Sequence, residues 1–308
     1  MTESEKELFF YLCRFSDVNE DRLNELLDHG ATPHVLGQLF FNRMQGIAYG
    51  VLKNAGLLGK VNREVRNSLA AAHRVNIEKN QSFNYCLQYL SNVLAEQKGK
   101  YAMLKGALLC GTYPAGYRTS NDIDLLVRAK DVTAIGESLS EAGFQQGHVR
   151  NNVFIPATRK EIIESRMMRG ETVPYILEIN LPGMKFLEVD INFSLDYKNG
   201  DEELLSDLLD HAKEVRVNGI DIITLSSEDF FIHLCNHLYK EATTYPWVKM
   251  KRDMTLYKYC DIYLLLNKFS EEETQMLVKR IQEMKMEKFV AARRSGRIVF
   301  WGLKIIIS

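Results

Sequence analysis

Hydrophobic residues recur at helical spacing through the first third of the chain. In residues 19–30 three leucines share one helical face, and the glycine that closes this segment predicts a stop. Residues 62–97 contain neither glycine nor proline, so they predict one long helix or two shorter ones. We therefore expect residues 1–98 to form a helical N-terminal region.

The hydrophobic pattern changes near residue 100, where short apolar runs replace the helical repeat. A short strand is expected at residues 101–105, followed by a short helix or turn, a loop and the strand-like run DIDLLV at residues 122–127. Residues 130–144 have the spacing of an amphipathic helix that a glycine closes. Three further strand-like runs follow, at residues 151–156, 175–183 and 185–195. This alternation predicts an α/β (α+β) core with a small mixed sheet over residues 99–222.

Beyond residue 222 the helical pattern returns. Ser226 or Ser227 is the expected N-cap of a helix whose first turn is acidic, and residues 255–269 contain a second apolar helix. Residues 223–308 are thus expected to form a helical C-terminal region that flanks the core. The last stretch, residues 289–308, fits this organisation poorly and is compatible with an edge strand, a docked tail or a disordered end.

Composition and charge exclude several classes of protein. The 308 residues carry a net charge of −1, without the basic excess expected of a DNA-binding protein. Five scattered cysteines without a CxxC pair indicate reduced thiols rather than a disulfide framework or a zinc site. The acidic first residues do not fit a signal peptide, and no apolar run approaches the ~20 residues of a membrane span. These features predict a cytoplasmic protein without a membrane partner.

Two carboxylates interrupt the apolar run DIDLLV. Side chains alternate across a strand, so Asp122 and Asp124 project to one face while the intervening residues project to the other. Two neighbouring carboxylates repel each other unless they are solvated or a hard cation neutralises them, and Mg²⁺ prefers such oxygen ligands. A pair of solvated aspartates at a strand start is the alternative interpretation.

A later strand-like run repeats this arrangement. Glu188, Asp190 and Asn192 share one face of the run at residues 185–195. Three carboxylates on adjacent strands would form a site for one or two metal ions, and two-metal sites serve in-line phosphoryl or nucleotidyl displacements. The second run therefore favours a metal site over a solvated pair.

Residues upstream of the aspartates predict a phosphate site. Lys105 and Gly106 stand where a strand leads into a helix, and a glycine there allows backbone N–H groups to approach an anion. Arg118 precedes Asp122 by four residues and could neutralise phosphate charge. We expect these three residues to border the same cleft as the aspartates.

Other polar residues carry weaker signals. His233 and His237 are four residues apart on one helical face, but no HExxH motif or third ligand accompanies them, so packing is favoured over zinc binding. Asp261 lies within an apolar helix, where a packing or salt-bridge role is favoured over a chemical one.

The combined motif LKGALL…R…NDIDLLV resembles the nucleotidyltransferase fold of the DNA polymerase β-like superfamily. More narrowly, it is similar to the family of uncharacterised nucleotidyltransferases, which has a Leu-Lys-Gly turn and an arginine before Asp-Ile-Asp. The similarity extends to SEAGF after the second strand and to HLCNHLYKEA…LYKYCDIYLLL near the C-terminus, and it covers most of residues 20–267.

The resemblance implies roles for individual residues. Asp122 and Asp124 match the metal-binding pair, Asp190 matches the third carboxylate, and Gly106 matches the motif glycine rather than Gly111. The same match makes His237 and Lys240 candidates for the substrate cleft, together with Glu188. In two departures, Ala107 replaces a residue that is often Ser or Gly, and Asn192 stands where the family often has histidine.

The fold and motif together predict metal-dependent transfer of a nucleoside monophosphate from an NTP to an acceptor hydroxyl, with release of pyrophosphate. The expected cofactor is Mg²⁺ or Mn²⁺, and ATP is the default NTP. The acceptor could be a small molecule, a peptide or RNA. Two alternatives stay open: another phosphoryl transfer at the same site, and a catalytically silent nucleotide-binding or antitoxin-like interaction protein.

Overall fold

The computed structural model describes most of the chain. Its description covers residues 1–15, 17–28, 30, 32–97, 101–195, 202–251 and 254–286. Residues 289–308, for which three structures were considered above, lie outside the described residues.

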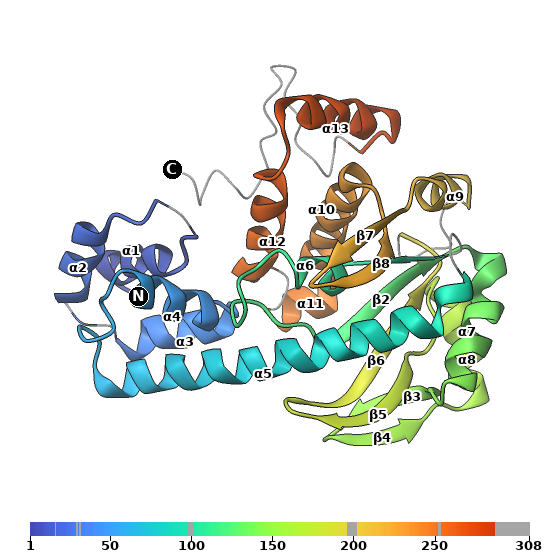
Figure 1. Cartoon of the computed structure of the whole chain (residues 1–308), viewed down its shortest axis with the longest axis horizontal. Helices are drawn as coiled ribbons and strands as arrows, with labels where there is room; N and C mark the ends of the chain where they lie inside the picture. Colours follow the sequence, from blue (N-terminus) through green and yellow to red (C-terminus); the bar gives the residue numbers. More distant parts are fainter. Residues whose placement is uncertain are drawn as a thin grey trace.

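Five helices precede the sheet, as the hydrophobic pattern predicts. They are α1 (Glu3–Leu12), α2 (Glu20–Asp28), α3 (Pro33–Phe41), α4 (Gln45–Asn54) and α5 (Arg63–Val93). The segment without glycine or proline forms one helix, α5, whose N-cap Asn62 accepts a hydrogen bond from the Val65 N–H group. With 31 residues, α5 is about 46 Å long and runs from the N-terminal helices to the sheet (Figure 1).

The described residues contain a mixed sheet of eight strands in the order β4-β3-β5-β6-β2-β1-β8-β7. The strands are β1 (Tyr101–Met103), β2 (Asp122–Val127), β3 (Gln145–Arg150), β4 (Val153–Pro156), β5 (Tyr175–Leu181), β6 (Met184–Asn192), β7 (Lys213–Val217) and β8 (Ile220–Thr224). The central pair β2–β6 is parallel, as is β1–β8, whereas the other neighbours are antiparallel. The expected α+β class is confirmed.

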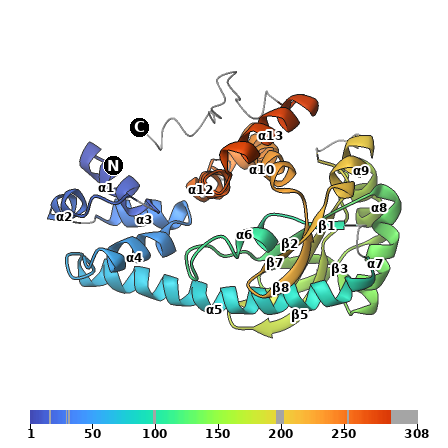
Figure 2. The ribbon, with the colours of Figure 1, turned by 45° about the horizontal axis from the view of Figure 1, so that its top comes forward.

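Two apolar clusters lie on opposite faces of the sheet. One joins β2 and β6 to the C-terminal half of α5 and to α7 (Val132–Glu141). The other joins the N-terminal helices to α9 (Glu202–Asp210), α10 (Ser227–Thr243), α12 (Leu256–Leu266) and α13 (Glu271–Glu283). Figure 2 shows α5 below the sheet and α10, α12 and α13 above it. The N-terminal and C-terminal helices therefore share one core.

The remaining described α-helices are α6 (Gly106–Leu109), α8 (Arg159–Met168) and α11 (Tyr245–Lys249), and two 3-10 helices span Ala95–Gln97 and Ala129–Asp131. Ser226 is the N-cap of α10, and its hydroxyl oxygen accepts a hydrogen bond from the Asp229 N–H group. One of the two serines proposed from the sequence is thus confirmed in this role. Gly143 follows α7 with φ 91°, a conformation that glycine adopts without strain.

The sheet is larger than the small sheet expected from the sequence. The expectation omitted β3, β7 and β8, together with α8 and α9. The hairpin β7–β8 has a sequence signal, because Asn218 and Gly219 both adopt positive φ (51° and 85°), as a two-residue type I′ turn requires. An Asn-Gly pair between alternating residues therefore identifies this hairpin.

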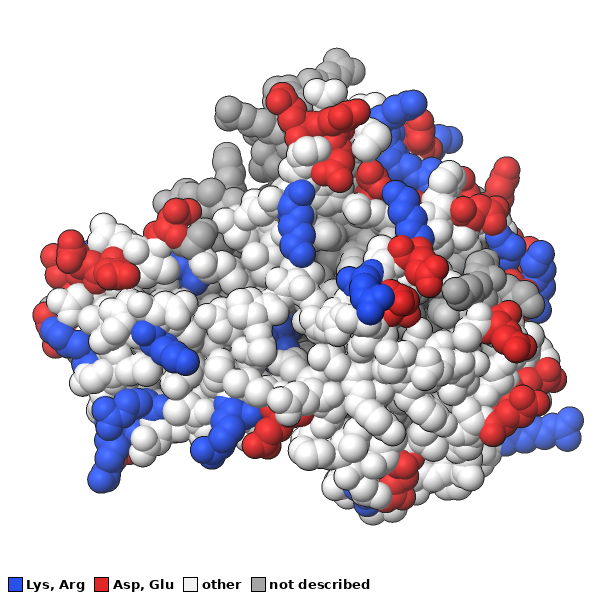
Figure 3. Space-filling model, in the orientation of Figure 1, with Lys and Arg blue, Asp and Glu red and all other residues white. Residues whose placement is uncertain are grey.

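Charges of both signs are interspersed along the edge of the face shown in Figure 3, whose centre is largely uncharged. This distribution agrees with the net charge of −1. The face offers no broad field of one sign that would steer a polyanion.

Candidate active site

The aspartates of β2 lie on the opposite face of the strand from a fully buried core. Ile123, Leu125 and Val127 are 0% exposed and pack towards α5 and α7. Asp122 and Asp124 project to the other face, where both line a cavity of about 1450 Å³. Strand alternation therefore separates the acids from the core, as predicted.

The register of β6 places two more acids beside them. Because β2 and β6 are parallel neighbours, Asp122 pairs with Glu188 and Asp124 pairs with Asp190. Neighbouring strands lie ~4.8 Å apart, so each pair brings two carboxylates to adjacent positions on one face. All four acids line the large cavity.

Lys105 neutralises one of these acids. Its Nζ lies 3.0 Å from Oδ1 of Asp124, which is only 7% exposed. Burial alone would raise the pKa of Asp124, but the Lys105 ammonium outweighs this effect and the pKa lies below its ordinary value. Asp124 is therefore ionised at neutral pH, with Lys105 as its counter-charge.

The acids of β6 have the opposite tendency. Burial, together with the charges of Asp124, Glu188 and Asp122, raises the pKa of Asp190 well above its ordinary value. Burial and the same two β2 aspartates also raise the pKa of Glu188. Carboxyl groups whose pKa values are shifted in opposite directions thus face one cavity, which is a feature of catalytic sites.

The donor set suits a hard cation, since carboxylate oxygens are the ligands that Mg²⁺ prefers and the acids repel one another without one. In the part of the chain that the structure describes, however, no three His, Cys, Asp or Glu side chains converge into a ready metal site. The Lys105 ammonium beside Asp124 balances part of the negative charge of these acids within the protein itself.

Gly106 has a steric role beside the site. A Cβ atom there would lie 2.2 Å from Oγ of Ser120, so only glycine allows the loop before β2 to pass. The hydroxyl of Ser120 in turn donates to Oδ1 of Asp122 over 3.4 Å. Gly106 begins the four-residue helix α6 but is not among the residues that line the large cavity.

Arg118 borders the cavity, yet its charge is already compensated. Its guanidinium donates to both oxygens of Asp261, over 2.8 Å and 3.0 Å, and Tyr113 donates its hydroxyl to the same carboxylate over 2.7 Å. Asp261 is 4% exposed. The salt-bridge role expected for Asp261 is confirmed. The guanidinium of Arg118 is directed at Asp261 and not at the phosphate site that the sequence predicted.

The wall formed by α10 supplies histidines and a further charge network. The rings of His233 and His237 are stacked with centroids 6.2 Å apart, and burial lowers the pKa of His233 to about 3. Nε2 of His237 lies 3.5 Å from Glu241, whose other oxygen lies 2.5 Å from Nζ of Lys258. His237 and Lys240 both line the large cavity, together with Lys105 and Arg118.

Comparison with known proteins identifies the family. The chain matches the family described as "Uncharacterised nucleotidyltransferase" over residues 28–294. It belongs to this nucleotidyltransferase family. A search of solved structures finds an antigenic nucleotidyltransferase-like protein from Paracoccidioides brasiliensis, 16% identical, with a TM-score of 0.33, over 66% of this chain and 90% of that chain. No curated protein matches.

The candidate site also contains residues to which the motif assigned no role. Arg43, Asn121 and Tyr257 line the cavity together with the acids. Arg43 follows α3 and Tyr257 lies on α12, so no sequence spacing relates them to the aspartates.

Among the described helices, none combines the length and apolar character that a membrane crossing requires.

Proposed function

We propose that this chain is a metal-dependent nucleotidyltransferase that moves a nucleoside monophosphate from an NTP to an acceptor hydroxyl. The observation that carries the proposal is the one-to-one register of Asp122 with Glu188 and of Asp124 with Asp190 on the walls of one cavity. At about 1450 Å³, that cavity exceeds the ~300–1,000 Å³ of pockets for single drug-sized ligands, which supports two bound substrates.

In the proposed reaction the acceptor oxygen attacks the α-phosphorus of the NTP. An oxygen–phosphorus bond forms, the bond from the α-phosphorus to the bridging oxygen breaks, and its electron pair leaves with pyrophosphate. The hydroxyl proton passes to the carboxylate of Asp190, which matches the third acid of the family and lines the cavity. The cavity wall holds the acceptor in line with the leaving group.

The remaining residues bind and orient the substrates. Asp122, Asp124 and Asp190 would hold Mg²⁺ or Mn²⁺, which neutralises phosphate charge when bound. Lys105 would donate to NTP phosphate oxygens from its position beside Asp124. His237 and Lys240 would contact a substrate from the α10 wall. We further propose ATP as the preferred NTP and the cytoplasm as the location.

The test measures NTP binding and pyrophosphate release separately. Asp190→Asn should bind an NTP with Mg²⁺ but release no pyrophosphate across the four NTPs and pools of hydroxylated acceptors. Lys105→Ala should raise the NTP dissociation constant about tenfold or more, the effect of one charge-assisted hydrogen bond. Glu137→Gln, an exposed acid on α7, is the matched control and should change neither quantity. Failure of the parent chain to bind any NTP would contradict the proposal.

A further inference from the structure

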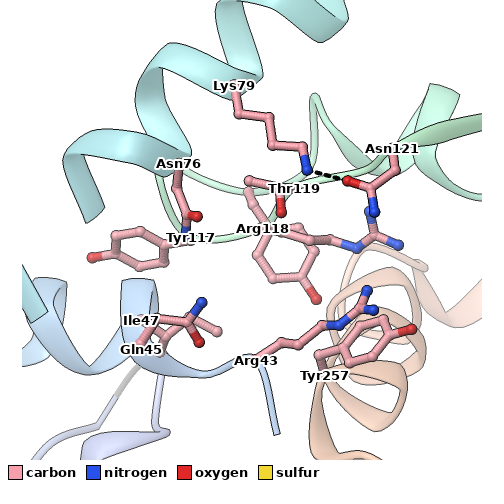
Figure 4. A pocket seen from close by; sticks show the side chains of 11 residues that line it. Arg43, Gln45, Ile47, Asn76, Lys79, Tyr117, Arg118, Thr119, Asn121 and Tyr257 are labelled. Carbon is pink, nitrogen blue, oxygen red and sulfur yellow. Dashed lines mark hydrogen bonds between the residues drawn. The ribbon is translucent and has the colours of Figure 1, made fainter. Parts of the chain in front are cut away.

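A second, smaller cavity lies beside the acidic one. It has a volume of about 200 Å³ and is bordered by α4, α5, α12 and the loop that precedes β2 (Figure 4). Because pockets for whole drug-sized ligands measure ~300–1,000 Å³, this cavity accommodates one group of a larger ligand. Arg43, Asn121 and Tyr257 line both cavities, so a group bound here remains within reach of the acids.

The small cavity has a cationic lining. Arg43, Lys79 and Arg118 border it, and no carboxylate does. Asp261 compensates Arg118, but within the described ranges no ion pair joins a carboxylate to Arg43 or Lys79. Lys79 instead donates to the amide oxygen of Asn121, the residue before Asp122 (Figure 4). Two cations without a carboxylate at ion-pair distance therefore face the same small space, and the charge of Asp122 only partly offsets that of Lys79.

The electrostatics favour an anion at this position. Burial lowers the pKa of Lys79, and the positive charge of Arg43 lowers it further. An anionic group between the two cations would remove this repulsion and would be bound by charge-assisted hydrogen bonds. Gln45 also borders the cavity, and its buried Oε1 has no hydrogen-bond partner in the described structure, so a ligand hydroxyl could donate to it.

The backbone conformation of Arg43 makes glycine a well-tolerated replacement for a test. Arg43 follows Asn42, the C-cap of α3, with φ 57°, and the next N–H group, of Met44, bonds to the carbonyl of Leu39 over 2.7 Å. This left-handed position after a helix favours glycine, because other residues pay about 1–2 kcal/mol there. The guanidinium carbon lies 5.0 Å from the ring centre of Tyr257, which holds the side chain at the cavity. An arginine thus stands where the backbone favours glycine.

We propose that Arg43 and Lys79 form an anion subsite that binds a phosphate-class group of the acceptor substrate. The inference rests on the proposed function, in which a nucleotide and an acceptor share the acidic cavity. Lys105 lies beside Asp124 and serves the NTP phosphates, whereas Lys79 contacts the residue before Asp122. The second cationic position is therefore assigned to the acceptor, which is a phosphorylated hydroxyl compound rather than a neutral one.

The test titrates inorganic phosphate into the full chain by calorimetry, alone and with Mg²⁺ plus a non-hydrolysable ATP analogue. Arg43→Gly and Lys79→Gln should each raise the phosphate dissociation constant about tenfold or more, while the analogue binds as it does to the parent. Arg43→Gly should also keep or raise the melting temperature, because glycine suits the position.

Lys285→Gly is the matched control. Lys285 follows α13 with φ 55°, and the next N–H group, of Met286, bonds to the carbonyl of Ile281, so the same basic-to-glycine change occurs at an equivalent helix end. Lys285 lines neither cavity and its substitution should leave phosphate binding unchanged.

Three results would overturn the subsite. The first is no phosphate binding by the parent, and the second is equal phosphate affinity in parent and variants. The third is competition between the analogue and phosphate with loss of analogue affinity in Arg43→Gly, which assigns the pocket to the nucleotide. If the analogue does not bind the parent, the proposed function fails, and phosphate titration of the protein alone still decides whether Arg43 and Lys79 bind an anion.

Discussion

At the scale of single residues, the four acids that β2 and β6 present to the cavity are not equivalent. Asp124 is ionised next to Lys105, whereas Asp190 and Glu188 lie where burial and like charges oppose ionisation. Such a difference follows from three-dimensional neighbours, because the two strands present their acids with the same spacing in the sequence. In the proposed reaction, proton transfer falls to β6 and charge pairing to β2.

Removing the charge of Asp190 should stabilise the metal-free protein. The folded state raises the pKa of this acid above the ordinary 3.8, so it binds a proton at pH values where the unfolded chain does not. Stability is therefore lost as pH rises from about 4. In a chelator at pH 7, Asp190→Asn should gain on the order of 1 kcal/mol, or about 2–4 °C in melting temperature. The gain should shrink towards pH 4 in calorimetric scans, and equal melting temperatures at pH 7 would contradict the assigned repulsion.

Removing one charge of the buried Arg118–Asp261 pair should lower the free energy of unfolding. Arg118→Ala leaves a buried carboxylate without its counter-charge, which is expected to cost about 3–5 kcal/mol in urea unfolding. Replacing both partners, as Arg118→Met with Asp261→Leu, should cost less than the single change. Arg216, exposed and paired with exposed Asp221, is the control, and its alanine variant should lose no more than about 1 kcal/mol.

At the scale of elements, the contact between α6 and the loop that precedes β2 positions the start of that strand. Ser120 passes against Gly106 and hydrogen-bonds Asp122 two residues later. The sequence identified Gly106 through a family motif and associated it with phosphate binding. The contact with Ser120 could not be predicted, because thirteen residues separate it from Gly106 and the path of the loop among them depends on contacts with α5 and α12.

Gly106→Ala should displace this loop. The added methyl group would overlap Ser120, so we expect a loss of about 1–3 kcal/mol and weaker metal-dependent NTP binding. Gly106→Ala combined with Ser120→Gly removes the overlap and should recover most of the stability. Gly59→Ala, which meets nothing within 4 Å and has no positive φ, should be neutral or slightly stabilising. A loss in Gly59→Ala equal to that in Gly106→Ala would show that the overlap is not the cause.

At the scale of the whole molecule, one apolar cluster unites segments from both ends of the chain. Leu8 and Leu23 of the first helices belong to the same cluster as Phe230 of α10 and Leu277 of α13. Helical periodicity predicted both helical regions, because it is a local property. It could not predict their common core, since contacts between residues more than two hundred positions apart leave no periodic signal.

This shared core should make the two helical regions unfold together. Hydrogen exchange under mild denaturant should give α1–α4 and α10–α12 similar opening free energies, because loss of either set exposes the apolar surface of the other. Leu23→Ala on α2 should lower the protection of both sets, whereas Ile135→Ala, in the cluster on the other face of the sheet, should act first on α7 and β2. Protection that falls in α1–α4 alone would indicate independent units.

The alternation along β2 and β6 also constrains how such a chain can diverge. Each acid alternates with a fully buried residue, so an insertion or deletion of one residue within either strand would turn carboxylates into the core and apolar side chains into the cavity. Length changes within these strands would therefore disrupt both the core and the acidic wall, whereas substitutions of the residues that line the cavities leave the alternation intact. Descendants of one ancestral gene would therefore keep the two-residue spacing of the acids even where the side chains around the small cationic cavity differ.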